Sequence, residues 1–255
     1  MSLERQCERL RSLHVPGTPL VLPNAWDVAS AKAVVAARFP VVATTSGGVA
    51  AALGYEDHEG APTDEMLDAA ARIAAAVDVP VTVDAEAGYG LEPAELVGAL
   101  KDAGAAGCNL EDTDHASGSV REPEENAAWL RQVREVAMEQ SYPLVVNARI
   151  DVFLADRARA QSELVPEALE RASAYFDARA DCVFPIFLRE PDALGSFVSS
   201  AGGPVNVLAI ADAPSLQELA GLGVARVSYG SLLHRLTMEA FASTLASIPV
   251  HPSPA

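Results

Sequence analysis

The sequence predicts an α/β protein built as one (β/α)8 barrel of the TIM type, a single domain spanning residues 1–255. Short runs rich in Val, Ala and Leu alternate with helical segments, which is typical of parallel βαβ units. About eight such units follow one another, and 255 residues is an ordinary length for one barrel. No glycine-rich phosphate-binding motif follows the first strand, which argues against a doubly wound nucleotide-binding sheet.

The amino-terminal half supplies the first four strands. A short amphipathic helix is expected over about residues 4–14, and Pro16-Gly17 ends it. The strands are runs of Val, Ala, Leu and Thr, expected over residues 20–22, 41–46, from 79 to the acidic pair at 84 and 86, and 107–112. Asp27 can cap the next helix, Thr63 begins another, and Pro93 suits the first position of a third. These helices are expected to run to about residues 38, 77 and 104.

The carboxyl-terminal half repeats the alternation with shorter connections. Strands are expected over residues 144–149, 182–184, 204–210 and 226–230. Helices are expected over residues 125–139, 166–179 and 215–221, with a last helix ending near 247. The tail over about residues 249–255 should be frayed. No linker or low-complexity segment divides the chain, which supports one domain.

Composition narrows the class of partner. The formal net charge is −17, so the surface should repel phosphate backbones and anionic membranes, and neither nucleic acid nor a membrane is an expected partner. Cys108 and Cys182 lie in apolar strand-like runs and are expected to be buried free thiols. This cysteine usage, with no transmembrane-length run and no secretory signal, favours a cytoplasmic protein.

Polar residues gather at the predicted carboxyl ends of the strands, where barrel enzymes carry their active sites. Asp84 and Glu86 share one face of their strand, about 7 Å apart, a spacing that suits a hard cation such as Mg²⁺. Glu111, at the end of the next strand, can add a third carboxylate. Asp112 points to the opposite face and is interpreted as structural. Solvated acids at a strand end are the alternative interpretation of Asp84 and Glu86.

Other strand ends can bind an anion. Arg149 can hold a carboxylate or phosphonate through two parallel hydrogen bonds, or it can form a buried ion pair with one of the acids. Ser46-Gly47-Gly48 offers a hydroxyl and backbone N–H groups to an anion, or it is a simple turn. His115 follows Glu111 in a polar loop and is the most interesting histidine.

Taken together, these residues resemble the phosphoenolpyruvate mutase/isocitrate lyase superfamily over about residues 20–240. The pattern from Asp84 to Gly90 is the most specific part. The motifs that carry the resemblance are Asn24-Ala-Trp-Asp27, Ser46-Gly47-Gly48, Leu53-Gly54 with Asp57, Asp84-Ala-Glu-Ala-Gly-Tyr-Gly90, Leu110-Glu-Asp112 and Ala148-Arg149.

The resemblance implies a barrel that binds Mg²⁺ or Mn²⁺ and a small anionic 2-oxo acid whose enolate the metal stabilises. It implies a metal site of Asp84, Glu86 and Glu111, with Asp57 behind them. It also implies substrate contacts from Ser46, Gly47, Gly48, Arg149 and, less directly, Asn206. Ser46, Arg149 and His115 are the candidate catalytic residues. Members of this superfamily tend to form tetramers in which the last helix packs on a neighbour, so a homo-oligomer, tetramer or dimer, is expected.

Two departures from the superfamily pattern bear on the reaction. Lyases carry Lys-x-Cys-Gly-His in the mobile loop after the fourth strand, whereas residues 113–120 contain neither lysine nor cysteine. Lyases also tend to have Phe-Pro-Glu after the sixth strand, where this chain has Phe184-Pro-Ile186. The loop equally lacks the Lys/Asn arrangement of the phosphonate mutases.

We therefore expect a Mg²⁺-dependent lyase or isomerase that forms or cleaves a C–C or C–P bond of a small 2-oxo acid through an enolate. Loop 113–122 would close over the site and supply an acid or base, with His115 as its candidate. The alternative is a catalytically reduced barrel that binds an anionic metabolite for sensing or assembly. The sequence leaves open the substrate, the choice among mutase, lyase, hydrolase and decarboxylase chemistry, and the oligomeric state.

Overall fold

Parallel strands pair in chain order to form the predicted ring. The structure is a computed structural model that describes residues 1–249. Six strands form one sheet: β2 (Asn24–Ala25), β3 (Val42–Thr44), β4 (Val81–Asp84), β5 (Gly107–Glu111), β8 (Val145–Ile150) and β9 (Cys182–Pro185). Three more pair as β1 (Leu20–Leu22), β11 (Arg226–Ser228) and β10 (Asn206–Leu208).

Two connections close these sheets into a barrel. A parallel bridge between Val183 and Val205 joins β9 to β10. On the other side, β1 and β2 are one chain segment interrupted at Pro23, which has no N–H for the ladder. β1 therefore pairs with β11 while β2 pairs with β3, and the eight-unit ring is complete.

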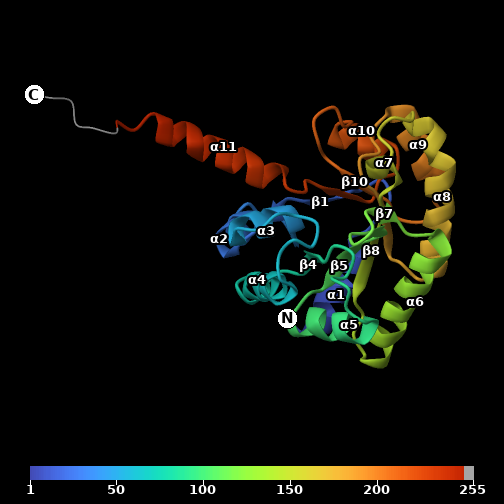
Figure 1. The fold of residues 1–255 in the computed structure, drawn as a ribbon, viewed down its shortest axis with the longest axis horizontal. Coiled ribbons are helices and arrows are strands. Elements are labelled where there is room, and N and C mark those ends of the chain that lie inside the picture. The colour runs from blue at the N-terminus through green and yellow to red at the C-terminus, as the bar shows by residue number, and fades with distance from the viewer. Residues whose placement is uncertain (250–255) are drawn as a thin grey trace, which may run out of the picture.

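Helices follow the strands and surround the ring. Figure 1 shows α5, α6, α8 and α9 along one side of the strands and α2, α3 and α4 along the other. Asp27 caps α2 as expected, accepting a hydrogen bond from the Ser30 amide at 2.7 Å. The helices are α1 (Leu3–Ser12), α2 (Val28–Ala36), α3 (Ser46–Leu53), α4 (Thr63–Ala75), α5 (Pro93–Asp102), α6 (Pro123–Glu139), α7 (Val152–Ala155), α8 (Gln161–Asp177), α9 (Pro191–Ser200), α10 (Leu216–Gly221) and α11 (Leu232–Ala246).

Several boundaries differ from the sequence prediction. Ser46, predicted as a strand end, is the first residue of α3. α8 begins at Gln161 instead of near Pro166, because Leu164 and Val165 are buried and extend the apolar face of the helix forward. α9 was not predicted, nor was the hairpin of β6 (Thr113–Asp114) and β7 (Ser119–Val120), which lies within the predicted polar loop. The predicted frayed tail falls almost entirely outside the described residues.

An ionic cluster, here called the Asp181 clamp, ties the amino ends of β8 and β9 to two helices. Asp181 accepts hydrogen bonds from Arg11 Nε of α1 at 2.7 Å and from the Val146 amide of β8 at 2.8 Å. Arg134 of α6 also pairs with it. Burial alone would raise the pKa of Asp181, but Arg134 and Arg11 lower it below its ordinary value.

Cys108 and Cys182 are confirmed as buried free thiols, and Cys7, for which no such prediction was made, is one as well. Cys7, Cys108 and Cys182 all lie in the core, and burial raises the pKa of each thiol to about 12. Across residues 1–249, no helix has both the length and the apolar character needed to cross a bilayer.

The last helix leaves the barrel. Figure 1 shows α11 running away from the other elements toward the carboxyl terminus, and none of its residues is buried. Met238, Phe241 and Leu245 recur on α11 at spacings of three and four, so they share one face, and Ile248 continues the spacing two residues past the end of the helix. Their exposed fractions run from 48% for Met238 to 56% for Ile248. An apolar helical face this open is typical of an interface.

Candidate active site

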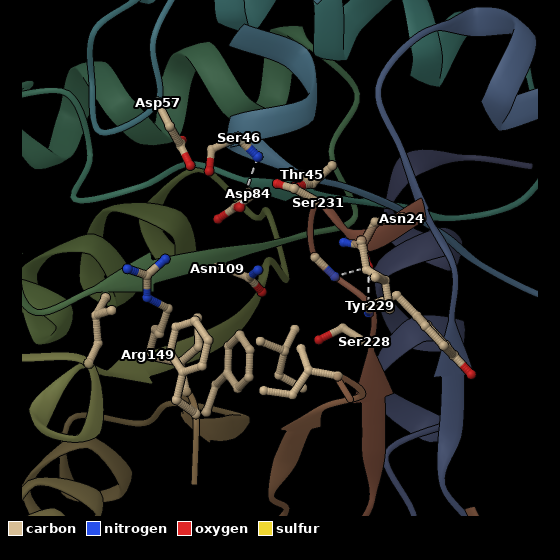
Figure 2. Close-up of a pocket in the computed structure, with 18 of the residues that line it drawn as sticks. Asn24, Thr45, Ser46, Asp57, Asp84, Asn109, Arg149, Ser228, Tyr229 and Ser231 are labelled. Carbon is tan, nitrogen blue, oxygen red and sulfur yellow. Dashed lines mark hydrogen bonds between the residues drawn. The ribbon is translucent and has the colours of Figure 1, made fainter. Parts of the chain in front are cut away.

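A pocket of about 600 Å³ opens where the carboxyl ends of the strands meet. Residues from eight strand ends or the loops just after them line it, as the barrel architecture predicts. Figure 2 shows Asp57, Ser46 and Asp84 together on one side, with Arg149 and Asn109 facing them. Four of the predicted site residues line this pocket, namely Ser46, Asp57, Asp84 and Arg149.

Asp84 is held at the end of β4 by the neighbouring strand. Its amide donates to Thr44 Oγ1 at 2.9 Å, and its Oδ2 accepts from the Ser46 amide at 3.0 Å. Ser46 opens α3, so the positive end of the helix dipole faces the carboxylate. The other oxygen, Oδ1, is buried without a hydrogen-bond partner among the described residues. Asp84 thus presents one free acceptor toward the pocket.

Glu86 lies one turn beyond the strand, in a backbone conformation that side chains rarely adopt (φ +47°). Its Oε2 accepts from the Glu59 amide at 2.5 Å, and Glu59 in turn accepts from the Tyr89 amide at 2.7 Å. Burial, together with the nearby Asp84, Asp57 and Glu111, raises the pKa of Glu86 to about 8, against the lowering effect of the hydrogen bond from the Glu59 amide. Among the described residues, Glu86 therefore lies near other acids and forms no ion pair.

Glu111 contacts two basic side chains. Its Oε1 lies 2.6 Å from Nε2 of His115, and its Oε2 pairs with Nη1 of Arg149. Glu111 and Arg149 are register partners on β5 and β8, which places them side by side. Burial raises the pKa of Glu111 against the lowering effect of both partners. The contact with Glu111 raises the pKa of His115, so this imidazole favours its protonated form.

Arg149 adopts the alternative that the sequence left open, a buried ion pair. Besides Glu111, it contacts Asp151 with Nε and Nη2 at 2.6 and 2.9 Å, a two-pronged geometry. Asp151 was not predicted as a site residue, although it lies two residues after Arg149 and side-chain alternation would place both on the same side. Asp112 is confirmed as structural: it is fully buried and accepts from Tyr175 at 2.6 Å.

The donor set fits a divalent cation that keeps most of its waters. Among residues 1–249, no three His, Cys, Asp or Glu side chains converge to hold one ion. Mg²⁺, however, is usually bound through one or two carboxylates plus water and substrate oxygens. Asp57 Oδ1 and Asp84 Oδ1 are both buried with no partner in the described chain, and both residues face the pocket. A cation would satisfy these oxygens and offset the acids around Glu86.

Gly47 and Gly48 take a packing role. A Cβ at Gly47 would lie 2.5 Å from Asp57 Oδ2 and 2.8 Å from Ser231 Oγ. A Cβ at Gly48 would lie 2.7 Å from the Thr45 side chain. Gly47 therefore lets Asp57 approach the first turn of α3, and Gly48 makes room for Thr45. They do not border the pocket, so their contact with substrate stays a prediction.

Two amides stabilise the first and last strands. Asn24 lines the pocket, and its Oδ1 accepts from the amides of Tyr229 and Gly230 at 2.8 and 3.0 Å. Figure 2 shows these bonds crossing from β2 to the segment after β11. Asn206 is fully buried and donates to Ser228 Oγ at 3.1 Å, so Ser228 borders the pocket in its place. Asn206 supports the site from below, and its predicted contact with substrate is untested.

Asn109 is a pocket residue that the sequence did not predict. Asn109 lines the pocket at the end of β5. Its Oδ1 accepts from Asn147 Nδ2 at 2.8 Å and from Arg226 Nη2 at 3.0 Å. With the oxygen held from below, the amide nitrogen is directed to the pocket, as Figure 2 shows. The alternation of side chains along β5 could have identified Asn109, because it shares a face of the strand with Glu111.

Comparison with known proteins identifies relatives along most of the chain. A profile of the phosphoenolpyruvate phosphomutase family matches residues 10–249. An uncharacterized protein of Mycobacterium tuberculosis (strain ATCC 25618 / H37Rv) is 36% identical over 238 residues, which cover 92% of this chain and 87% of the relative. The probable 2-methylisocitrate lyase 2 of Corynebacterium glutamicum is 30% identical over 240 residues, covering 89% and 75%.

A solved structure is also similar. It is the crystal structure of a protein from Burkholderia cenocepacia J2315 that is provisionally assigned as a phosphonomutase. It aligns with a TM-score of 0.91 and 39% identity, covering 95% of this chain and all of the other. The barrel and the sequence of this chain therefore point to the same relatives.

Proposed function

We propose a function on the premise that this chain belongs to the phosphoenolpyruvate phosphomutase family. Its homologues are mutases and lyases of the phosphoenolpyruvate mutase/isocitrate lyase superfamily, enzymes that break C–C or C–P bonds of small acids. The chain is an enzyme of this superfamily. The proposed activity is formation or cleavage of a C–C or C–P bond in a 2-oxo acid, dependent on Mg²⁺ or Mn²⁺ and passing through an enolate.

One observation supports the metal-dependent assignment most strongly. Two half-buried aspartates, Asp57 and Asp84, line one side of the pocket, and each has a buried Oδ1 that no other described group satisfies. Unpaired buried carboxylates are unfavourable, so an arrangement of this kind is typical of a cation site. Asp84 and Asp57 would hold the cation, with Glu86 and Glu111 acting through its waters. When bound, the cation supplies Lewis-acid stabilisation of an enolate oxygen.

The chain's own groups would bind and orient the substrate. Arg149 carries a buried charge at the pocket wall and would exchange its contact with Glu111 for a contact with an anionic substrate group. Asn109 would donate its Nδ2 hydrogens, and Ser46 would offer its hydroxyl at the start of α3. His115 would hold or release a proton at Nε2, next to Glu111. A second cavity of about 190 Å³ connects His115 with Arg149.

We also propose that the protein is a cytoplasmic homo-oligomer, a tetramer or a dimer. Three buried free thiols favour a reducing compartment. The apolar face of α11, defined by Met238, Phe241, Leu245 and Ile248, would pack on a neighbouring copy.

The test is calorimetric titration with oxalate, a mimic of the pyruvate enolate, with and without Mg²⁺. We expect binding that requires Mg²⁺ in the native protein and is lost in Asp84→Ala. The matched control is Asp78→Ala, an exposed acid before the amino end of the same strand, which should bind oxalate normally. Equal binding by Asp84→Ala would refute the metal assignment. Absence of binding by every form would favour the sensing or scaffold role.

A further inference from the structure

The pocket has two chemically different parts. The part that includes Ser46, Asp57, Asp84, Asn109 and Arg149 is polar and charged. The other part is built by the segments that follow β9 and β10, where the charged Arg189 and Asp212 also border the pocket further along the chain. All its lining residues within 184–187 and 208–211 are apolar, and we call this set the apolar wall: Phe184, Ile186, Phe187, Leu208, Ile210 and Ala211. Figure 2 shows aromatic rings and aliphatic side chains filling the space between Arg149 and Ser228.

The apolar wall is more than a three- or four-carbon acid needs. A volume of about 600 Å³ lies within the range that takes much larger ligands. A small acid bound between Asp84 and Arg149 would leave the wall facing water. Apolar surface in a concave site gains free energy when a ligand removes it from water. The group that would complement the wall is therefore an apolar group attached to the acid.

A strained turn after β9 positions one residue of the apolar wall. The Leu188 amide donates to the Pro185 carbonyl at 3.1 Å, closing a four-residue turn with Phe187 at its third position. Phe187 has φ +65°, a position where glycine is favoured. An aromatic side chain is kept there against conformational strain, and it lines the pocket while the Arg157 guanidinium stacks on its ring at 4.6 Å.

Ile186 is the residue of the apolar wall at which a charged side chain would most change the kind of substrate that fits. It follows Phe184-Pro185 at the end of β9, its amide donates to the Ile150 carbonyl at 3.2 Å, and its side chain is half-buried against the pocket. A carboxylate in its place would demand a polar substrate group. An isoleucine there rejects such a group, because a buried polar atom without a partner is unfavourable.

We propose that the substrate is a 2-oxo acid carrying a hydrophobic substituent of several carbons, which lies against the apolar wall while the acid lies between Asp84 and Arg149. Ile186 sets this preference, together with Ile210, which lines the same pocket. The inference rests on the proposed function, since it assumes that the polar part binds the 2-oxo acid.

N-alkyl oxamates test this proposal, because they mimic a 2-oxo acid, do not react, and differ only in the length of the alkyl tail. Their affinity is measured by calorimetry in the presence of Mg²⁺, from N-methyl to N-butyl oxamate, with oxalate as the reference. We expect affinity to rise about fourfold with each added methylene, so about 60-fold across the series. Ile186→Glu should abolish the rise while oxalate still binds. Leu216→Ala, an exposed apolar truncation outside the pocket, should leave the rise intact.

The outcomes separate the two proposals. Oxalate binding together with a flat oxamate series would overturn the hydrophobic-substituent inference and leave the proposed function standing. Failure of oxalate and of every oxamate would overturn the proposed function and this inference with it. An unchanged rise in Ile186→Glu would show that the tail does not meet this wall. Ile210→Ala is the second variant should Ile186→Glu unfold, and it should reduce the rise.

Discussion

Arg226 donates a hydrogen bond from Nη2 to Oδ1 of Asn109 at 3.0 Å, joining the barrel interior to the pocket. Arg226 is 1% exposed, and its Nε and Nη1 have no hydrogen-bond partner within residues 1–249. Burial lowers its pKa below the ordinary arginine value. The guanidinium therefore forms no ion pair with the described residues, and its one hydrogen bond among them fixes the amide that faces the pocket.

Arg226→Met should separate stability from binding. Removing an unpaired buried charge should leave the free energy of unfolding unchanged or raise it by about 1–4 kcal/mol in urea titrations. Loss of the bond to Asn109 should weaken Mg²⁺-dependent oxalate binding about tenfold. Arg72→Met, at an exposed 3.7 Å pair with Asp68, should change neither quantity. Unaltered oxalate affinity in Arg226→Met would contradict the positioning role.

Gly47→Ala should impair the site without unfolding the barrel. The new methyl group would displace Asp57, whose Oδ2 lies 2.5 Å from the Cβ position. We expect oxalate affinity in Mg²⁺ to fall at least about tenfold, a loss of about 1.4 kcal/mol. The control is Gly98→Ala in α5, where nothing lies within 4 Å and helix propensity should add about 0.5–1 kcal/mol of stability. Native affinity in Gly47→Ala would show that Asp57 does not serve the cation.

Stability should depend on His14 in acid. Burial lowers the pKa of His14 to about 4, while its Nδ1 lies 2.9 Å from the Leu10 carbonyl. Below pH 6.5, His14 is protonated in the unfolded chain, whereas in the folded chain it stays neutral down to about pH 4. The stabilisation is therefore complete above pH 6.5 and falls as the pH drops to 4, by about 3 kcal/mol.

The measurement compares native protein with His14→Gln by urea unfolding at several pH values, because the difference cancels the contribution of other titrating groups. The native protein should lose stability relative to the variant between pH 6.5 and 4. A constant difference across this range would disprove the assignment.

The apolar face of α11 should control assembly. Phe241 is 55% exposed at the centre of this face, so Phe241→Glu should lower the mass measured by light scattering toward that of one chain. Ser243→Glu, on the opposite side of the helix, should keep the native mass. A native mass in Phe241→Glu would rule out this face as the interface.

Alternation along the strands predicted much of the site, because parallel strands bring their carboxyl ends to one place. Asp84, Arg149 and Ser46 were found in this way and do line the pocket. The pairing of Arg149 with Glu111 depends on which residues stand opposite each other across two strands. The sequence pattern within either strand does not predict that register.

The rest of the site depends on segments without regular periodicity. The apolar wall comes from the ends of β9 and β10 and from the turns after them, whose path is set by tertiary packing. The start of α3 at Ser46 could not be predicted for a related reason. Two consecutive glycines indicate a turn, whereas here both lie within a helix and the first of them, Gly47, permits close contact with Asp57.

The Asp181 clamp has a bearing on how this protein could diversify. It joins α1, α6, β8 and β9 at the amino ends of the strands, while the pocket lies at their carboxyl ends. Anchorage and chemistry thus occupy opposite ends of one scaffold. Insertions or exchanges in the carboxyl-end loops would therefore change part of the pocket lining without disturbing this anchorage.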